Sequence, residues 1–451
     1  MKLDKIANLL NYCNTNYSQT IEGLAYKLGD VGPNFIFFAK SGDPIQIEEA
    51  IKKGATAIVA NKTALCDTPL FTTASTTKAL AKVAHSFYEK PSQKLTATGI
   101  LGTSGKSTLS QLIQQIYKQL NVKSSHLEKN EIPTALEINK LLVDVYENQV
   151  KNAIIEICLS HIVDNHLDHT HFTTLIHTTT SPHLKMEDKW NLTKPFIRLG
   201  EDQTAIINLD DPLAPNLQEA TVANVITYGT GRSADIRAQN INQTMDRTTF
   251  DLYQKESFIC QLKLPLLGLY NVYNTLALLA YFSREGYQLE VIVNLLEDIL
   301  PIGGRLEKIN SNAKFNVMID HADEPCALES VLKSLSVITK GKVIALLPAN
   351  GGKTRDHLSQ MGKIALANST HVIFTGKPTP RDDAHRIIYD MLRGNVRDNY
   401  TIVIDQERAI LKALKMAEDG DTVILLEKED QNHIGISTKR IAQYTLEKLQ
   451  P

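Results

Sequence analysis

The last third of the chain alternates short, mostly apolar runs with segments whose apolar residues recur at helical spacing. The runs predict buried strands at 317–320, 343–347, 371–374, 401–404 and 422–426. The segments between them predict helices at 327–338, 358–367, 385–392 and 409–417. This alternation is typical of a parallel, doubly wound, Rossmann-like sheet. Ligands of such sheets lie beyond the carboxyl ends of the strands, here near Asp320, residues 350–353 and residues 375–377.

A smaller pattern of the same kind opens the chain. Apolar runs at 35–39 and 56–60 predict two buried strands, and the spacing of apolar residues predicts helices at 47–53 and 77–88. The whole chain is therefore expected to have an α/β fold. Its 451 residues suffice for about three domains. We expect these domains to span residues 1–94, 95–303 and 304–451.

A glycine-containing turn joins a predicted strand, 98–101, to a predicted helix that carries an apolar stripe from Leu109 to Leu120. The turn and the start of the helix read Gly102, Thr103, Ser104, Gly105, Lys106, Ser107 and Thr108. This arrangement is typical of a phosphate-binding loop, in which backbone N–H groups and the helix N-terminus face the phosphates. Lys106 is then expected to reach the terminal phosphates, and the hydroxyl of Ser107 or Thr108 to bind Mg²⁺.

The loop meets only the short pattern G-x-x-G-K-S, because Ile100 stands where the longer pattern has its first glycine. The alternative is a glycine turn that merely caps a helix. The flanking strand and helix favour nucleotide binding, since they supply the context in which such a loop works.

One carboxylate, Glu156, lies inside the apolar run 153–158. A buried carboxylate is costly unless it is paired or binds a cation. Beside a phosphate loop, a strand-borne carboxylate is well placed to bind Mg²⁺, so we favour a metal ligand. A structural ion pair is the alternative.

Two further groups of polar residues, a set of histidines and a pair of asparagines, allow more than one interpretation. Histidines are frequent between His161 and His183, but their spacing fits no standard zinc signature, and exposed or loop positions are expected for His166, His169 and His171. Asn271 and Asn274 precede a predicted helix at 275–282. They are expected either to cap that helix or to contact a nucleotide base.

Composition narrows the class of protein. Hydrophobic residues make up 43% of the chain, charged residues 22%, and the net charge is −2, so neither a nucleic acid nor a membrane surface is an expected partner. The five cysteines form no C-x-x-C pair, which is typical of a reducing compartment. Neither a signal peptide nor a membrane-spanning run is evident. A cytoplasmic location is therefore expected.

Several motifs together carry a resemblance to a known family. They are the loop 102–108, Glu156 in its strand, the segment Thr178 to His183, the run Gly268 to Asn274, Gly304-Arg305-Leu306-Glu307, the run Val317 to Ala322 and Met361 to Ala365. Over nearly its whole length the chain resembles the Mur ligases, and most of all the branch that adds the third residue of the peptidoglycan stem peptide. The resemblance implies a UDP-type substrate domain, a central ATP-binding domain with a P-loop ATPase-like sheet, and a C-terminal domain that binds an amino acid.

The resemblance also implies roles for individual residues. Ser107, Glu156 and His183 would bind Mg²⁺, and Asn271 and Asn274 would contact the adenine of ATP. Arg305 and Asp320 would reach the nucleotide from the third domain, so domain closure would assemble the site. Lys194 is the candidate for the family's carbamoylated lysine, although its position differs by about one residue from the family pattern.

Other motifs of the family are altered. The segment that grips uridine is replaced by Ala25-Tyr26-Lys27, and the one that contacts the muramoyl peptide by residues 131–133. Asp323 stands in place of a histidine of the third domain. The amino-acid selector motif and a motif near the chain end are changed at 377–380 and 427–431. The nucleotide side is thus better preserved than the substrate side.

The implied function is ATP-dependent ligation of an amino acid to a carboxylate through an acyl phosphate. Expected ligands are ATP, Mg²⁺, an amino acid and a UDP-muramoyl peptide or related acceptor, with cell-wall synthesis proteins as further partners. Three alternatives stay open: a ligase for an acceptor without UDP, a catalytically idle paralog that binds nucleotide as a regulator or scaffold, and a P-loop kinase. The kinase leaves Asn271, Arg305 and the C-terminal sheet unexplained.

Overall fold

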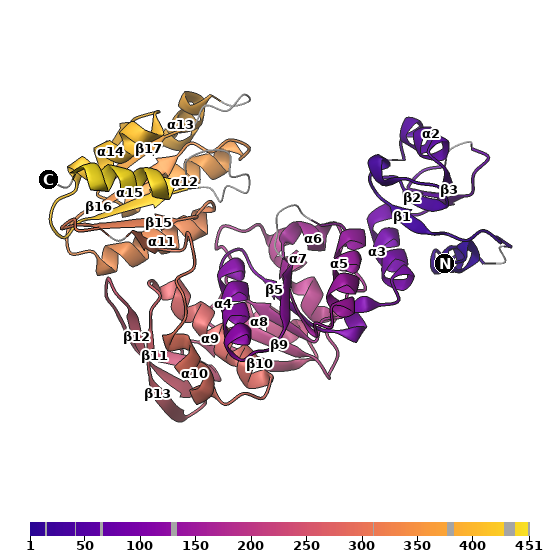
Figure 1. Cartoon of the computed structure of the whole chain (residues 1–451), viewed down its shortest axis with the longest axis horizontal. Helices are drawn as coiled ribbons and strands as arrows, with labels where there is room; N and C mark the ends of the chain where they lie inside the picture. The colour runs from indigo at the N-terminus through magenta and orange to yellow at the C-terminus, as the bar shows by residue number, and fades with distance from the viewer. Residues whose placement is uncertain are drawn as a thin grey trace. The chain divides into compact units, whose positions relative to one another are not determined.

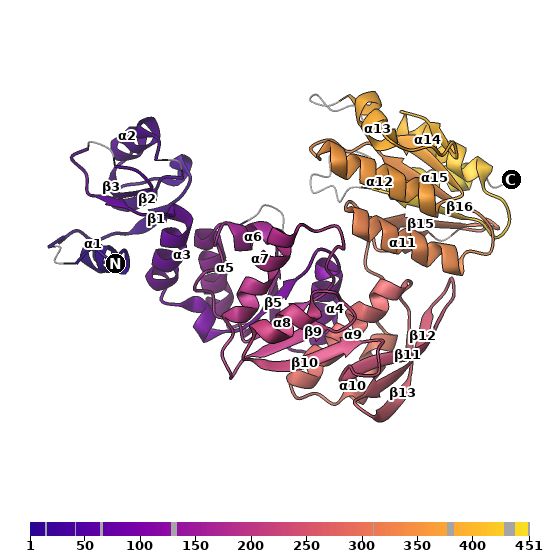
Figure 2. The same cartoon turned by 180° about the vertical axis from the view of Figure 1, so that it is seen from behind.

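The structure is a computed structural model that describes residues 1–13, 16–40, 42–63, 66–127, 133–309, 311–376, 383–427 and 438–449. The chain folds into two compact units that interleave along the sequence. The first comprises Met1–Gly102, Tyr117–Ile207 and Leu213–Ile226, and the second Thr103–Ile116, Asn208–Pro212 and Thr227–Pro451. Figures 1 and 2 show the elements of both units from opposite sides. The expected α/β fold is confirmed, while the domain boundaries near 94 and 303 stay predictions.

A small parallel sheet opens the first unit, with strand order β1-β2-β3-β4. Its strands are β1 (Gly23–Ala25), β2 (Phe35–Phe38), β3 (Ala55–Ala60) and β4 (Leu70–Thr72), and its helices are α1 (Leu3–Leu9), α2 (Pro44–Lys52) and α3 (Thr76–Phe87). Short 3-10 turns lie at η1 (Leu28–Asp30) and η2 (Pro91–Lys94). Both strands predicted here are confirmed. Helix α2 begins three residues earlier than predicted because the Asp43 side chain accepts the Ile45 N–H and Pro44 occupies the first turn.

Five parallel strands of the chain's middle region follow in the order β9-β8-β5-β7-β6. They are β5 (Thr96–Leu101), β6 (Ser124–Leu127), β7 (Asn152–Ile157), β8 (Thr174–His177) and β9 (Thr204–Asn208). The helices of this region are α5 (Ala135–Glu147), α6 (Leu159–Val163), α7 (Met186–Ile197) and α8 (Ala214–Ala220). Strand β5 is flanked by β7 and β8, so the segment that leaves its carboxyl end emerges between two neighbouring strand ends.

The second unit contains α4 (Lys106–Gln119) over most of its length, and the end of β10 (Asn224–Gly229), which pairs with β11. An antiparallel meander, which the sequence analysis did not predict, consists of β11 (Ile236–Gln243), β12 (Thr248–Gln254) and β13 (Ser257–Leu264). Helices α9 (Leu269–Arg284) and α10 (Leu289–Glu297) follow. Helix α9 starts six residues before the predicted 275, so Asn271 and Asn274 lie inside it.

The C-terminal sheet has the order β14-β15-β19-β16-β17-β18. Its strands are β14 (Glu307–Ile309), β15 (Asn316–Asp320), β16 (Val343–Pro348), β17 (His371–Thr375), β18 (Tyr400–Ile402) and β19 (Thr422–Leu426). Between them lie α11 (Pro325–Ile338), α12 (Arg355–Asn368), α13 (Ala384–Leu392) and α14 (Gln406–Met416), and α15 (Thr438–Leu449) ends the described chain. Among the strands of this sheet that the structure describes, only β14 is antiparallel to its neighbour, so the predicted parallel, doubly wound sheet is confirmed.

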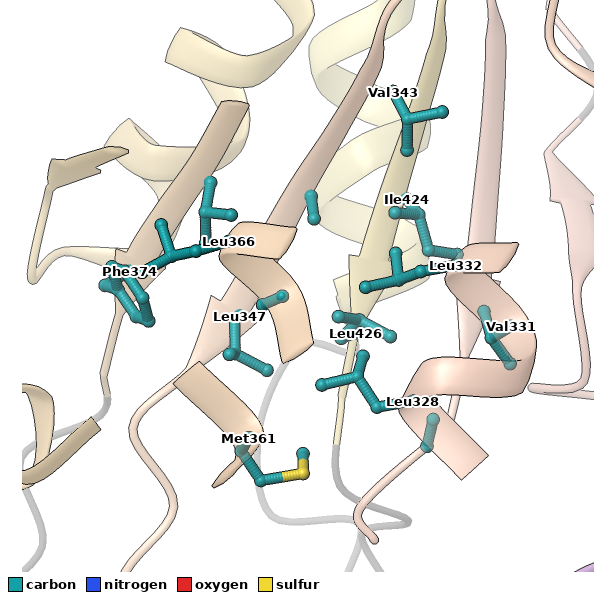
Figure 3. Packing of buried hydrophobic residues seen from close by; sticks show 14 of the residues in the cluster. Leu328, Val331, Leu332, Val343, Leu347, Met361, Leu366, Phe374, Ile424 and Leu426 are labelled. Carbon is teal, nitrogen blue, oxygen red and sulfur yellow. The ribbon is translucent and has the colours of Figure 1, made fainter. Parts of the chain in front are cut away.

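Helices cover both faces of this sheet. On one face, α11, α12 and α13 bury a continuous apolar cluster against the strands, and on the other face α14 and α15 do the same. Figure 3 shows Leu328 and Leu332 of α11 pointing towards Ile424 and Leu426 of β19. Close packing also needs Gly362 in α12, because a Cβ at this position would collide with the carbonyl of Met391 at the end of α13. Within the described residues, no helix has the length and apolar character needed to cross a membrane.

Candidate functional site

The expected phosphate loop has the predicted strand before it and the predicted helix after it. Strand β5 ends at Leu101 and α4 begins at Lys106. Gly102 and Gly105 both have positive φ angles, +143° and +86°, which glycine adopts without the strain of a side chain. A Cβ on Gly102 would also collide with the Thr178 hydroxyl. The loop therefore presents the N-terminus of a 14-residue helix, where backbone N–H groups favour an anion.

Glu156 lies next to the strand that leads into this loop. It pairs in register with Ile100 on β5, two residues before Gly102. The residue is only 5% exposed, as its position in an apolar strand predicts. Its Oε1 atom lies 2.8 Å from Nε2 of His126, a residue on β6 that the sequence analysis did not single out. The structure thus gives Glu156 a buried partner, and its role as a metal ligand stays a prediction.

The segment after β8 is tied to the end of β5. The amide and the hydroxyl of Thr178 both donate to the carbonyl of Leu101, at 2.8 and 3.1 Å. His183 follows in an exposed turn, where its N–H donates to the Ser181 hydroxyl at 3.3 Å. Lys194 lies on α7, and its Nζ donates to Oδ1 of Asn191 at 2.6 Å. These side chains therefore belong to the first unit, together with Glu156.

Among the residues that the structure describes, no three or more His, Cys, Asp or Glu side chains gather closely enough to hold a metal ion by themselves. Mg²⁺ rarely uses such an all-protein cage. It is usually bound by one or two carboxylates together with water and substrate phosphates. The carboxylate of Glu156, on the strand next to β5, has the oxygen chemistry that this ion prefers.

The asparagines of α9 hydrogen-bond locally. Gly268, at φ +90°, occupies the N-cap position, so neither asparagine caps the helix from there. Asn271 donates from Nδ2 to the Leu267 carbonyl at 2.7 Å, and Asn274 donates from Nδ2 to Oδ1 of Asn271 at 3.3 Å. Both residues are buried. Contact with a nucleotide base stays a prediction for this pair.

Asp210, which contacts Tyr273 of α9, is a hydrogen-bonded carboxylate that the sequence did not predict as a site residue. Asp210 accepts hydrogen bonds from the amide and the hydroxyl of Thr230, at 2.6 and 2.7 Å, and from the Tyr273 hydroxyl at 2.9 Å. Burial opposes ionisation, but these donors hold the pKa of Asp210 below its ordinary value. The pair Asp210-Asp211 at the end of an apolar run was the available signal.

Within the second unit, the charge of Arg305 acts on the carboxyl group of Asp320. Asp320 ends β15 with 2% exposure, and its Oδ2 accepts the Leu306 N–H at 2.8 Å. Burial raises the pKa of Asp320 to about 6, and the charge of Arg305 opposes that rise. A buried carboxylate next to an arginine, at the carboxyl end of a parallel strand, lies where the sequence predicted a ligand-facing group.

A small pocket of about 30 Å³ opens beyond β15, β16 and β19. Its lining includes Asp323, Asn350, Lys353, His357 and Glu427. Its volume is on the order of that needed for one water molecule. Lys353 donates to Oε1 of the neighbouring Glu324 at 2.7 Å. The pocket adjoins the predicted ligand region at 350–353, whereas Lys377 to Pro380 and Lys428 to Gln431 lie outside the described residues.

The residues at the family's uridine-gripping position are held by internal contacts. Lys27 donates from Nζ to Oε1 of Glu137 at 3.1 Å, and the other oxygen of Glu137 accepts the Thr134 N–H at 2.7 Å at the start of α5. The ring of Tyr26 stands edge-on to the ring of His166, at 6.4 Å between centroids. Ala25 is fully buried. Glu131 and Ile132, which replace part of the muramoyl-contacting motif, lie outside the described residues.

The predicted loop histidines follow α6, and one of them stacks on a histidine of α3. The rings of His85 and His169 lie 6.4 Å apart and nearly parallel. His166 is buried rather than exposed, at 5%. Burial, with a smaller contribution from the charge of His169, lowers the pKa of His85 to about 4. Burial also lowers the pKa values of His166 and His169.

These shifts predict acid destabilisation of the first unit. Unfolded histidines titrate near pH 6.5, so between about pH 6.5 and 4 the unfolded chain binds more protons and stability falls as pH falls. For His85 we expect a loss on the order of 2 kcal/mol between pH 7 and pH 4 in urea unfolding. His85→Gln should remove that share of the pH dependence, and His183→Gln, at an exposed position, should leave it unchanged. Equal slopes for wild type and His85→Gln would contradict the prediction.

Comparison with known proteins adds independent information. The family model described as "Mur ligase middle domain" matches residues 100–282, and "Mur ligase, glutamate ligase domain" matches residues 304–426. The chain is 30% identical to the UDP-N-acetylmuramoyl-L-alanyl-D-glutamate–2,6-diaminopimelate ligase of Aquifex aeolicus over 437 residues, which covers 92% of this chain and 89% of that protein. The ligase of the same name from Bacillus cereus is also 30% identical, over 414 residues, 86% of this chain and 84% of that one.

Solved structures share the fold. A structure of a UDP-N-acetylmuramoyl-L-alanyl-D-glutamate–2,6-diaminopimelate ligase has a TM-score of 0.70 at 19% identity and covers 99% of each chain. MurF ligase from Thermotoga maritima, in complex with ADP, has a TM-score of 0.66 at 18% identity, covering 98% of this chain and 99% of that one. A Mycobacterium tuberculosis folylpolyglutamate synthase, complexed with ADP and AMPPCP, has a TM-score of 0.63 at 14% identity, covering 81% and 94%.

The two family matches fall on the phosphate loop, Glu156 and α9 in the middle of the chain, and on the doubly wound sheet at its end. The match to the Aquifex aeolicus ligase covers 92% of the chain, which is more than the two family models cover together. The chain therefore belongs to the Mur ligase family and, as a member of it, is a ligase.

Proposed function

We propose that the chain is an ATP-dependent carboxylate–amine ligase that joins an amino acid to an acceptor carboxylate through an acyl phosphate. The observation that carries this proposal is the phosphate loop on β5, with Lys106 at the N-terminus of α4 and the buried Glu156 on the adjacent strand. The relatives named above act on UDP-N-acetylmuramoyl-L-alanyl-D-glutamate and 2,6-diaminopimelate, and related solved structures hold ADP or AMPPCP. The proposal assigns this chain the same reaction class.

In this reaction an acceptor carboxylate oxygen attacks the γ-phosphorus of ATP, and ADP leaves. The amine of the incoming amino acid then attacks the acyl carbon, loses a proton, and expels inorganic phosphate as the amide forms. Lys106 would balance charge on the β- and γ-phosphates, while Ser107, Glu156 and His183 would hold Mg²⁺. The metal would neutralise charge that develops on the transferred phosphoryl group.

Other residues of the chain would bind and orient the reactants. Asn271 and Asn274 would contact the base of ATP, and Arg305 and Asp320 would bind its sugar and phosphates. Lys194 is the candidate for modification by carbon dioxide, which would convert its ammonium group into an anionic carbamate. Small molecules are thus the expected partners, and we propose that the reaction takes place in the cytoplasm, where ATP is available.

Two acceptor classes fit this proposal. The relatives favour a UDP-linked muramoyl peptide. The contact between Lys27 and Glu137 favours an acceptor without UDP, because the cation at the uridine-gripping position already has a carboxylate partner.

The test is ATP-dependent phosphate release, screened over UDP-muramoyl peptides, other carboxylates and amino acids, with mass spectrometry of the products. We expect release to need both an acceptor and an amino acid, with one amide formed for each phosphate. Nucleotide binding without any amide product over the whole panel would contradict the ligase proposal and support a regulatory paralog.

A further inference from the structure

A buried histidine–glutamate pair lies beside the strand that leads into the phosphate loop. Nε2 of His126 is 2.8 Å from Oε1 of Glu156, and the two side chains are only 2% and 4% exposed. Burial of a carboxylate is costly unless hydrogen bonds or charges compensate it. His126 provides one such compensation for Glu156.

The register of the sheet fixes where the pair lies. His126 on β6 is opposite Ile154 on β7, and Glu156 lies two residues further along β7, on the same face. On its other side Glu156 is opposite Ile100 of β5, two residues before the loop begins. Glu156 is therefore flanked by His126 on one side and by the loop-bearing strand on the other.

We propose that His126 is a positioning residue, which donates from Nε2 to Glu156 and holds that carboxylate in one orientation for the divalent cation that accompanies the nucleotide. This inference rests on the proposed function, which makes Glu156 a metal ligand. Carboxylates that bind metals are commonly oriented by a second hydrogen-bonding group, whose loss weakens metal binding by roughly 10–100-fold. A purely structural pair would stabilise the sheet without affecting the metal.

The experiment measures Mn²⁺ binding in the presence of ADP by electron paramagnetic resonance, and ADP binding without metal by calorimetry. Three variants separate the roles of the ring. His126→Gln places an amide nitrogen near the position of Nε2, His126→Asn has an amide that is too short to reach it, and His126→Leu has no donor. His371→Gln is the matched control, because His371 contacts the Thr401 hydroxyl through Nε2 in the C-terminal sheet.

We expect His126→Leu and His126→Asn to weaken Mn²⁺ binding by roughly 10–100-fold, with metal-free ADP affinity nearly unchanged. His126→Gln should recover most of the loss, and His371→Gln should match wild type. If His126→Leu does not fold, the difference in Mn²⁺ affinity between His126→Asn and His126→Gln provides the same test.

Three outcomes separate a failure of this inference from a failure of the proposed function. If Glu156→Gln weakens Mn²⁺ binding while folded His126→Asn binds Mn²⁺ as wild type does, the positioning role is wrong and the nucleotide–metal site stands. Equal Mn²⁺ affinities for His126→Gln and His126→Asn would also overturn the positioning role. If the wild-type protein binds neither ADP nor Mn²⁺–ADP, the proposed function itself is wrong.

Discussion

Lys106→Ala is expected to weaken ATP and ADP binding by roughly 100-fold or more, which corresponds to about 3 kcal/mol. The lysine begins α4 directly after the glycine turn, where its ammonium and the helix N-terminus attract the same phosphates. Removing one partner of a desolvated charge pair costs more than removing an exposed charge. The measurement is calorimetric nucleotide binding, together with the rise in melting temperature that ATP gives to the wild-type protein.

Lys118→Ala provides a matched control on the same helix. Lys118 is exposed in the last turn of α4, at the opposite end from the loop. We expect this variant to bind ATP as wild type does, and both variants to have wild-type melting temperatures without nucleotide. Wild-type ATP affinity in Lys106→Ala would rule out the phosphate-loop assignment.

The second large effect concerns the acceptor. We expect UDP-muramoyl dipeptide to bind roughly 100-fold more weakly than it binds to a diaminopimelate ligase such as that of Aquifex aeolicus, since each unmatched polar group costs on the order of 1–3 kcal/mol. Lys27 is engaged by Glu137, whose other oxygen caps α5 through Thr134. As a point charge it also lacks the planar, two-pronged donor geometry of an arginine.

The acceptor prediction is checked by competition binding and by ligation kinetics with lysine and with diaminopimelate. Glu137→Gln serves as the companion variant, because it removes the partner charge of Lys27 while preserving side-chain size. It should improve binding of the UDP-linked dipeptide if Lys27 faces a phosphate in the bound state. Saturable, efficient ligation onto that dipeptide by the wild-type chain would show that uridine is recognised by other contacts.

The fold was largely predictable because its strands are short, apolar and separated by helices. In the C-terminal domain, the strand predicted at 422–426 coincides with β19. The helix predicted at 327–338 corresponds to α11, which in the structure begins two residues earlier, at Pro325. The meander β11 to β13 was missed because its strands lack the continuous apolar runs of the other sheets and include many polar side chains; β11 is buried only over its first three residues. The early start of α9 was missed because Gly268 caps the helix by its backbone conformation, which leaves no side-chain signal.

The candidate site was predictable where its chemistry is local in sequence. The glycine turn and Lys106 lie within one short stretch, and their flanking elements are as predicted. His126 was not predictable in this way, because it is 30 residues from Glu156 and the two meet only through the order of β6 and β7. A charge inside an apolar strand does imply a partner, but it does not identify the strand that provides it. The roles of the individual site residues stay predictions.

The order of strands in the C-terminal sheet has a consequence for synthesis of the protein. Strand β19 lies between β15 and β16 in the sheet, although it is synthesised after both. More than seventy residues separate the end of β16 from the start of β19. On the ribosome, β15 and β16 therefore emerge with unpaired edges and wait for the strand that will join them. Such edges are prone to pair with other chains. The nascent C-terminal domain thus completes the centre of its sheet only after β19 has been synthesised, and premature termination before Thr422 removes the centre of the sheet rather than its edge.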